Sequence, residues 1–327
     1  MRLPVDVRDL MRSGSQLQEE RERPVRIAVF VELDTPDELF ETVRSRFRPY
    51  TANAVLHVEI AEPGTKLIVD PSADAVVCLI GSGADSIAGS LAEARERAVP
   101  AVALALAEDP APVAERLAHP YRDTLTNPDA VHLVDIELGE WLVERLPSKH
   151  LALAHNFEFM RRAVAVERVK NTAVQNALIG AIALIPGADL PLMTANQSKM
   201  LLQIAAAYGE QLGAQRWKEL AGVVGGAFAL RAVARQAVAF LPGFGWVIKG
   251  GIGYTGTIAM GFAAIKYFEG DADLGDLQSR LEEYGRQVMA RVRAMSLRER
   301  KAALPADQRA ALEAAQAPAE ERTAGDA

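Results

Sequence analysis

The chain of 327 residues has one cysteine and five histidines, and each shortage excludes a class of protein. The single cysteine, Cys78, rules out a disulfide scaffold, and its place in the apolar run 75–80 predicts a buried thiol, not a nucleophile. The five histidines lack the i, i+4 pairing of a helical zinc site, and no Gly-x-Ser-x-Gly segment marks a serine nucleophile. We therefore predict no catalytic residue, no metal site and no cofactor.

An excess of basic residues is also missing. The formal net charge is −7, and binding of nucleic acid needs a basic face, so a nucleic-acid partner is not expected. The first 23 residues mix charges of both signs and lack the apolar core of a signal peptide. These features predict a cytoplasmic protein, with association at the cytoplasmic face of a membrane left open. No small-molecule substrate is indicated.

Long uncharged apolar runs of spanning length are missing as well. A spanning helix needs about 20 apolar residues. The run 171–188 carries several polar residues and is broken by Pro186, and the run 189–208 contains Asn196, Gln197 and Lys199. The glycine-rich run 250–265 comes closest to the criterion. The pattern favours a soluble bundle of apolar helices over a spanning one, while contact with a lipid surface stays open.

The sequence shows two patterns of secondary structure, one in its first half and one in its second. Between residues 25 and 146, short β-branched runs alternate with helical patterns, which predicts an α/β domain with a doubly wound, mostly parallel sheet. Candidate strands are residues 26–31, 54–60, 66–69, 75–80, 101–107 and 130–136. Candidate helices are residues 36–47, 84–98, 112–118 and 138–146.

From residue 149 onward only helical patterns fit. We expect a charged helix at residues 155–175, two helical hairpins, a middle helix near residues 211–220 and an amphipathic helix at 273–295. The predicted organisation is given by four segments. These are a polar arm (1–24), the α/β domain (25–146), an all-α double-hairpin domain (147–295) and a polar, partly disordered tail (296–327).

The two hairpins form an internal repeat. Each turns at a Pro-Gly pair, Pro186-Gly187 in the first copy and Pro242-Gly243 in the second, because proline ends a helical ladder and glycine accepts the exit conformation. Each copy ends on an aromatic residue followed by glycine, at Tyr208-Gly209 and at residues 267–270. The polar and basic side chains around the turns are our candidates for membrane or partner contact. The complete set is Pro186, Gly187, Asp189, Asn196, Lys199, Arg231, Arg235, Pro242, Gly243, Trp246 and Lys249.

The order of elements in the α/β domain resembles a small Era-like or Ras-like GTPase, although the slots that would bind nucleotide are altered. The phosphate-loop slot, residues 32–39, carries four carboxylates where glycines and a lysine are needed. The base-reading slot keeps only its acid, Asp109. Gly81 and Gly83 begin a partial glycine motif before a helix, which we read as a tight turn with weak capacity for an anion. Any other doubly wound domain fits the pattern equally.

The helical part resembles the YcjF-type domain of unknown function that often follows Era-like GTPases. The resemblance covers residues 165–270 and rests on residues 175–180, 185–191, 196–200, 208–209, 241–243 and 249–250. It implies a bacterial, membrane-associated helical module without an established activity, behind a pseudo-GTPase.

The function predicted from these features is a non-catalytic, membrane-peripheral scaffold or regulator. In it the hairpins contact lipid or a membrane partner, and the α/β domain presents a protein-binding surface. Two alternatives stay open: a nucleotide-responsive switch with a non-standard phosphate loop, and a soluble homo-oligomer in which the glycine-rich hairpins pack together.

Overall fold

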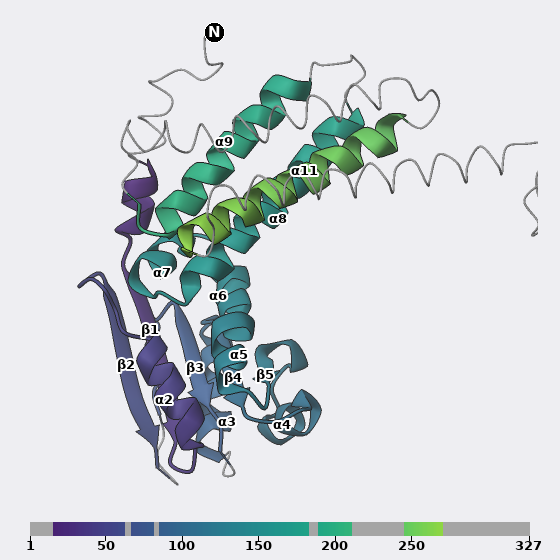
Figure 1. Cartoon of the computed structure of the whole chain (residues 1–327). Coiled ribbons are helices and arrows are strands. Elements are labelled where there is room, and N and C mark those ends of the chain that lie inside the picture. Colours follow the sequence, from purple (N-terminus) through teal and green to yellow (C-terminus); the bar gives the residue numbers. More distant parts are fainter. Residues whose placement is uncertain (1–15, 63–66, 82–84, 183–188, 211–244, 271–327) are drawn as a thin grey trace, which may run out of the picture.

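The computed structural model describes residues 16–62, 67–81, 85–182, 189–210 and 245–270. Within them, five strands form one parallel sheet in the order β2-β1-β3-β4-β5 (Figure 1). The strands are β1 (Val25–Glu32), β2 (Ala54–Ala61), β3 (Ala75–Leu79), β4 (Ala101–Ala105) and β5 (Thr124–Thr126). The predicted α/β class with a parallel sheet is confirmed.

Helices cover both faces of this sheet. Successive residues of a strand point to opposite faces, so that they belong to two separate hydrophobic cores. Ile27 and Val29 face a core shared with α2 (Asp37–Arg46) and with the helices that follow β5. Ala28 and Phe30 face the other core, under α3 (Asp85–Glu96) and α4 (Pro110–Leu117). Cys78 lies in this second core, fully buried, and burial raises the pKa of its thiol. The expected buried cysteine is confirmed.

The strand predicted at residues 130–136 is wrong. The segment is helical and consists of α5 (Ala130–His132) and a π-helical turn η2 (Leu133–Leu138), which lead into α6 (Gly139–Arg145). Asp129 caps the start, because its side chain accepts hydrogen bonds from the backbone N–H groups of Val131 and His132. The true last strand, β5, has only three residues and lies just upstream.

The strand predicted at residues 66–69 is wrong as well, since residues 67–70 pair with no strand. Leu67 and Val69 are buried in the α3 core, which explains their apolar character. Their carbonyl groups bind side chains around α3 instead of a neighbouring strand: Arg97 donates to Val69 O at 2.7 Å, and Ser90 donates to Leu67 O at 3.5 Å. The segment therefore packs against α3.

Beyond the sheet lies a helical module. It contains α8 (Met160–Ile182), α9 (Asp189–Ala207) and α11 (Gly245–Phe268), and α8 packs against both of the others. These helices extend away from the sheet (Figure 1). Both Pro-Gly turns, the predicted middle helix, the helix predicted at 273–295 and the tail lie outside the described residues.

The predicted ends of the two repeat copies lie side by side. The chain leaves α9 through Gly209 and α11 through Gly270, with φ values of +83° and +79° that favour glycine. The Tyr208 ring stacks on Phe268 at 5.6 Å, and the Tyr208 hydroxyl donates to Glu269 at 3.0 Å. An aromatic residue followed closely by glycine thus ends both helices, as expected from the repeat.

One buried core continues from the sheet into the helical module. The core that holds Val29 also holds α7 (His150–Asn156), the first turns of α8 and the last turns of α9, including Leu202 and Ala206. Residues 16–21 of the predicted polar arm are helical, and Leu17 belongs to the same core. The buried core therefore runs across the predicted boundary at residues 146–147.

Candidate functional site

The carboxyl edge of the sheet is the place where an open parallel sheet usually binds ligands. The chain passes from β1 to β2 on one side and then to β3 on the other, so the loops after β1 and β3 border the switch point. Here Glu32 ends β1, is buried, and accepts a hydrogen bond from the Gly81 N–H at 2.6 Å. Arg116 donates to the Gly81 carbonyl at 3.0 Å. A carboxylate of the chain thus holds the N–H group that a phosphate would need.

The loop after β1 is packed tightly against Gly81. A Cβ atom built on Gly81 would lie 2.6 Å from the Asp34 carbonyl oxygen and 2.7 Å from its carbonyl carbon. Thr35, one residue further on, donates from its hydroxyl to Leu79 O at 3.1 Å. The sequence placed residues 32–39 and Gly81 in separate slots, and the structure brings them together.

We expect Gly81→Ala to destabilise the protein by about 2 kcal/mol, because the added Cβ would overlap backbone atoms that no rotamer change can move. Gly89→Ala is the matched control. Gly89 is exposed on α3 with open space at its Cβ position, so alanine there should stabilise by up to about 1 kcal/mol. Urea denaturation followed by circular dichroism measures both. A stabilising effect at Gly81 would contradict the observed packing.

The other residues suggested for nucleotide contact have local roles or are not described. Asp109 caps α4, since its side chain accepts a hydrogen bond from Ala111 N at 2.9 Å. Gly83 lies outside the described residues. Asp109, the acid of the predicted base-reading slot, therefore serves as the N-cap of α4.

A buried polar network joins the three helices of the module. The Thr257 hydroxyl accepts hydrogen bonds from Asn176 Nδ2 at 2.9 Å and Gln197 Nε2 at 3.0 Å, and it donates to Gly253 O at 2.7 Å. One donor and two acceptor positions are all that a hydroxyl has, so Thr257 is fully bonded. Asn176, Gln197 and Thr257 are completely buried. The network ties α8, α9 and α11 at one level.

The structure describes the side chains of two of the candidate contact residues of the hairpins, Asn196 and Lys199. Asn196 is partly buried and donates to Asn176 Oδ1 at 3.1 Å, which makes it part of the polar network. Lys199 is exposed on α9. Asp189, Trp246 and Lys249 lie within α9 and α11, at positions where only the backbone is described. The remaining candidates, Pro186, Gly187, Arg231, Arg235, Pro242 and Gly243, lie outside the described residues.

The part of the module far from the sheet exposes large apolar side chains. Val174 and Leu178 lie one turn apart on α8, Leu192 is near the start of α9, and Tyr254 is in the first half of α11. Residues 171–182 of α8 contain no charged side chain. Among the described helices, none is both long and apolar enough to cross a bilayer. We refer to these four exposed apolar side chains together as the distal apolar surface.

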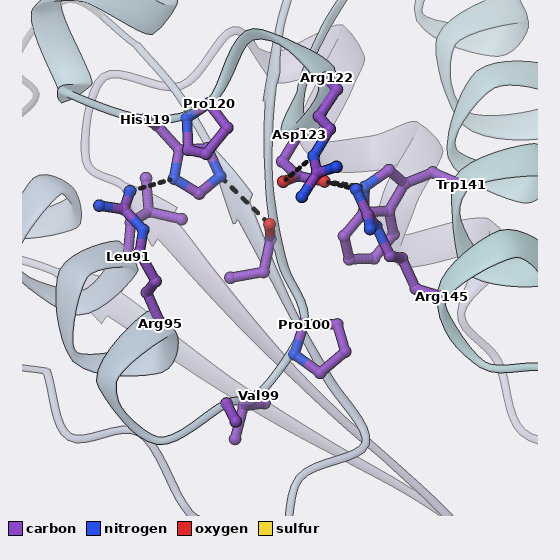
Figure 2. A pocket seen from close by; sticks show the side chains of 12 residues that line it. Leu91, Arg95, Val99, Pro100, His119, Pro120, Arg122, Asp123, Trp141 and Arg145 are labelled. Carbon is purple, nitrogen blue, oxygen red and sulfur yellow. Dashed lines mark hydrogen bonds and ion pairs between the residues drawn. The ribbon is translucent and has the colours of Figure 1, made fainter.

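A cavity of about 270 Å³, the amino-edge pocket, lies at the opposite edge of the sheet, beside the start of β4 (Figure 2). Its polar lining consists of Arg95, His119, Arg122, Asp123 and Arg145, with Trp141 as the aromatic wall. These residues come from α3, the end of α4, the 3₁₀ turn η1 (Tyr121–Asp123) and α6. Sequence reasoning missed this site because no motif links segments so far apart in the chain.

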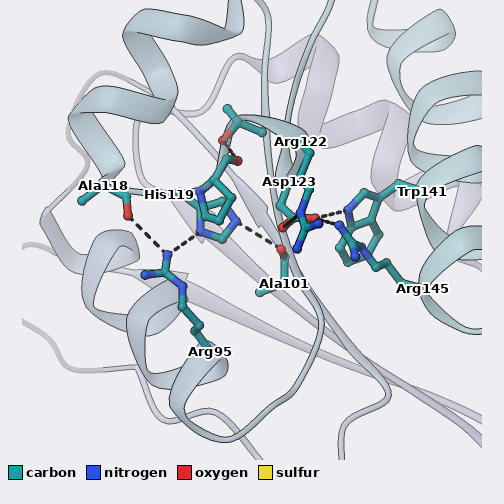
Figure 3. Close-up of polar contacts among 10 residues, drawn as sticks. Arg95, Ala101, Ala118, His119, Arg122, Asp123, Trp141 and Arg145 are labelled. Carbon is teal, nitrogen blue, oxygen red and sulfur yellow. Dashed lines mark hydrogen bonds and ion pairs between the residues drawn. The ribbon is translucent and has the colours of Figure 1, made fainter.

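Asp123 organises one side of the pocket (Figure 3). Its Oδ1 accepts hydrogen bonds from Trp141 Nε1 at 2.9 Å and from Arg145 Nη2, whose guanidinium also lies over the Trp141 ring at 5.8 Å. Its Oδ2 is 3.6 Å from Arg122 Nε. The carboxylate therefore fixes Arg145 and Trp141 in place.

His119 organises the other side (Figure 3). Its Nε2 lies 3.2 Å from the Ala101 carbonyl, which can only accept, so Nε2 carries the proton. Its Nδ1 then accepts from Arg95 Nη2 at 3.3 Å. Burial lowers the pKa of this imidazole, against the opposing effects of the Ala101 bond and the Asp123 charge. The ring is thus held neutral.

Within the described residues, no three histidine, cysteine, aspartate or glutamate side chains gather as ligands for a metal ion. No protein-family model, curated protein or solved structure matches this chain. The likeness to the YcjF-type helical domain and to small GTPases therefore stays a prediction made from the residues quoted above.

Proposed function

We propose that the protein is a non-catalytic, membrane-peripheral scaffold whose helical module rests on a lipid surface through its distal apolar surface. The observation that carries this proposal is the exposure of Val174, Leu178, Leu192 and Tyr254. They belong to the parts of α8, α9 and α11 that do not enter the core shared with the sheet. Apolar side chains of this kind lie in the interface between lipid headgroups and acyl chains without spanning the bilayer.

The α/β domain, in this proposal, is a degenerate GTPase-like domain that serves as a protein-binding surface. Support comes from the carboxyl edge of its sheet. The Gly81 N–H already has a carboxylate partner in Glu32, and a second carboxylate residue, Asp34, packs against the same glycine. An incoming phosphate would meet these negative charges in place of donors, which disfavours the nucleotide-responsive alternative.

Flotation with liposomes tests the lipid contact. We expect the full chain to float with vesicles of neutral phosphatidylcholine, since apolar contact needs no lipid charge. The double variant Val174→Gln, Leu178→Gln should partition at least tenfold more weakly, because two large apolar side chains contribute together about 3 kcal/mol or more when buried. Glutamine adds no charge, so repulsion does not enter.

The matched control is Val131→Gln on α5. Val131 is exposed to 45%, comparable with 52% for Val174 and 57% for Leu178, but it belongs to the α/β domain. Its replacement should leave flotation unchanged. If the wild-type chain does not float with neutral or anionic vesicles, or if Val131→Gln weakens flotation as much as the double variant, the proposal is wrong.

A further inference from the structure

The amino-edge pocket has an excess of positive charge. Three guanidinium groups, those of Arg95, Arg122 and Arg145, line it together with a single carboxylate, Asp123. His119 adds no charge because its Nδ1 lone pair accepts the Arg95 hydrogen bond. Two positive charges are thus left uncompensated by the lining of the pocket.

The donors of two arginines are available to a ligand. Arg95 uses one nitrogen, Nη2, for both of its hydrogen bonds, to the Ala118 carbonyl at 3.2 Å and to His119. Within the part of the chain that the structure describes, its Nε and Nη1 make no hydrogen bond. Arg122 has 76% of its side chain exposed and touches Asp123 only at 3.6 Å. Guanidinium groups present N–H donors in a planar fork that matches a phosphate or carboxylate.

The rest of the pocket is apolar. Leu91, Val99, Pro100 and Pro120 contribute apolar side chains to the lining, and the Trp141 ring lies on one side (Figure 2). The cavity volume of about 270 Å³ is enough for several water molecules or for one small organic molecule. This space fits a small organic anion with a compact apolar body, and it is too rich in apolar lining for a bare inorganic ion.

We propose that the amino-edge pocket binds a small phosphate monoester, with its dianionic phosphate between Arg95 and Arg122 and its apolar body against Pro100 and Trp141. Arg145, held by Asp123, contributes long-range attraction and supports the aromatic wall. The site lies at the opposite edge of the sheet from Glu32 and Gly81 and on a different part of the molecule from the distal apolar surface. It is therefore independent of the lipid contact proposed above.

Isothermal titration calorimetry of the full chain tests this site, with phenyl phosphate as the probe in a low-salt buffer free of phosphate. We expect saturable binding of phenyl phosphate, weaker binding of inorganic phosphate and none of phenol. Arg95→Gln and Arg122→Gln should each weaken phenyl phosphate binding about tenfold, the usual effect of losing a hydrogen bond to a charged group. Added salt should weaken it further.

Arg44→Gln is the control variant. Arg44 is an exposed arginine on α2 that pairs with Glu41 and lies outside the pocket. Its replacement should leave the affinity unchanged, and circular dichroism should show that all three variants keep the wild-type fold. No saturable binding to the wild type, or equal weakening by Arg44→Gln, would overturn the site. Inorganic phosphate binding as tightly as phenyl phosphate would overturn the role of the apolar lining.

Discussion

Replacement of Thr257 by valine is expected to destabilise the protein by about 3 kcal/mol, although the two side chains have nearly the same shape. The change removes the acceptor of the Asn176 and Gln197 amide groups and the donor to the Gly253 carbonyl, all inside the module. Each buried polar group left without a partner costs roughly 1–3 kcal/mol. Urea denaturation, followed by the helical signal in circular dichroism, measures the decrease in the free energy of unfolding.

The variant Thr257→Ser distinguishes the contribution of the hydroxyl to stability from that of the methyl group. Serine keeps the hydroxyl and loses one methyl, so we expect a loss of only about 1 kcal/mol. The order wild type, serine, valine in stability is therefore the prediction. If valine is as stable as the wild type, the hydroxyl does not organise the three helices, and the polar network has no structural importance.

The second large effect is expected at Gly253, where α11 crosses α8. A Cβ atom there would lie 2.7 Å from the Asn176 backbone oxygen and 3.2 Å from its carbonyl carbon. Backbone atoms of a helix cannot move aside as a flexible side chain can, so the two helices would have to separate. We expect Gly253→Ala to destabilise by about 3 kcal/mol, at the upper end of overpacking effects.

Gly256→Ala provides a control three residues further along the same helix. Nothing lies within 4 Å of a Cβ atom at Gly256, so alanine should stabilise by up to about 1 kcal/mol through its better helix propensity. Both substitutions replace glycine by alanine, but they should change the free energy of unfolding in opposite directions. Equal effects would mean that α8 and α11 do not approach closely at Gly253.

The regular elements could be predicted where one local signal dominated. The strands β1 and β3 are short apolar runs rich in valine, and most of their residues are buried. In β2 the β-branched residues Val55, Val58 and Ile60 are exposed, and β4 consists mainly of alanine. Residues 130–136 failed because β-branched side chains suggested a strand, while the spacing of Ala130, Leu133, Val134 and Leu138, all buried on one side, is helical. The Asp129 cap was a second local signal for the helix.

The sites were predictable only in part, because tertiary contacts decide them. Asn196 and Gln197 stand out as polar residues in an apolar run, but their partner Thr257 is 60 residues from Gln197 and looks ordinary in sequence. The amino-edge pocket depends on the meeting of His119 with Arg95 and of Asp123 with Trp141. None of these pairs has a fixed spacing that a motif could represent.

The core that passes from the sheet into α9 has a mechanical consequence. Leu202 and Ala206 share buried contacts with the same cluster as Val29 and Val77, so the last turns of α9 cannot rotate without disturbing packing beneath the sheet. Interiors this dense transmit strain, since few voids absorb it. We therefore expect a force on Leu192, near the start of the same helix, to reach the packing at Leu202 some three turns away.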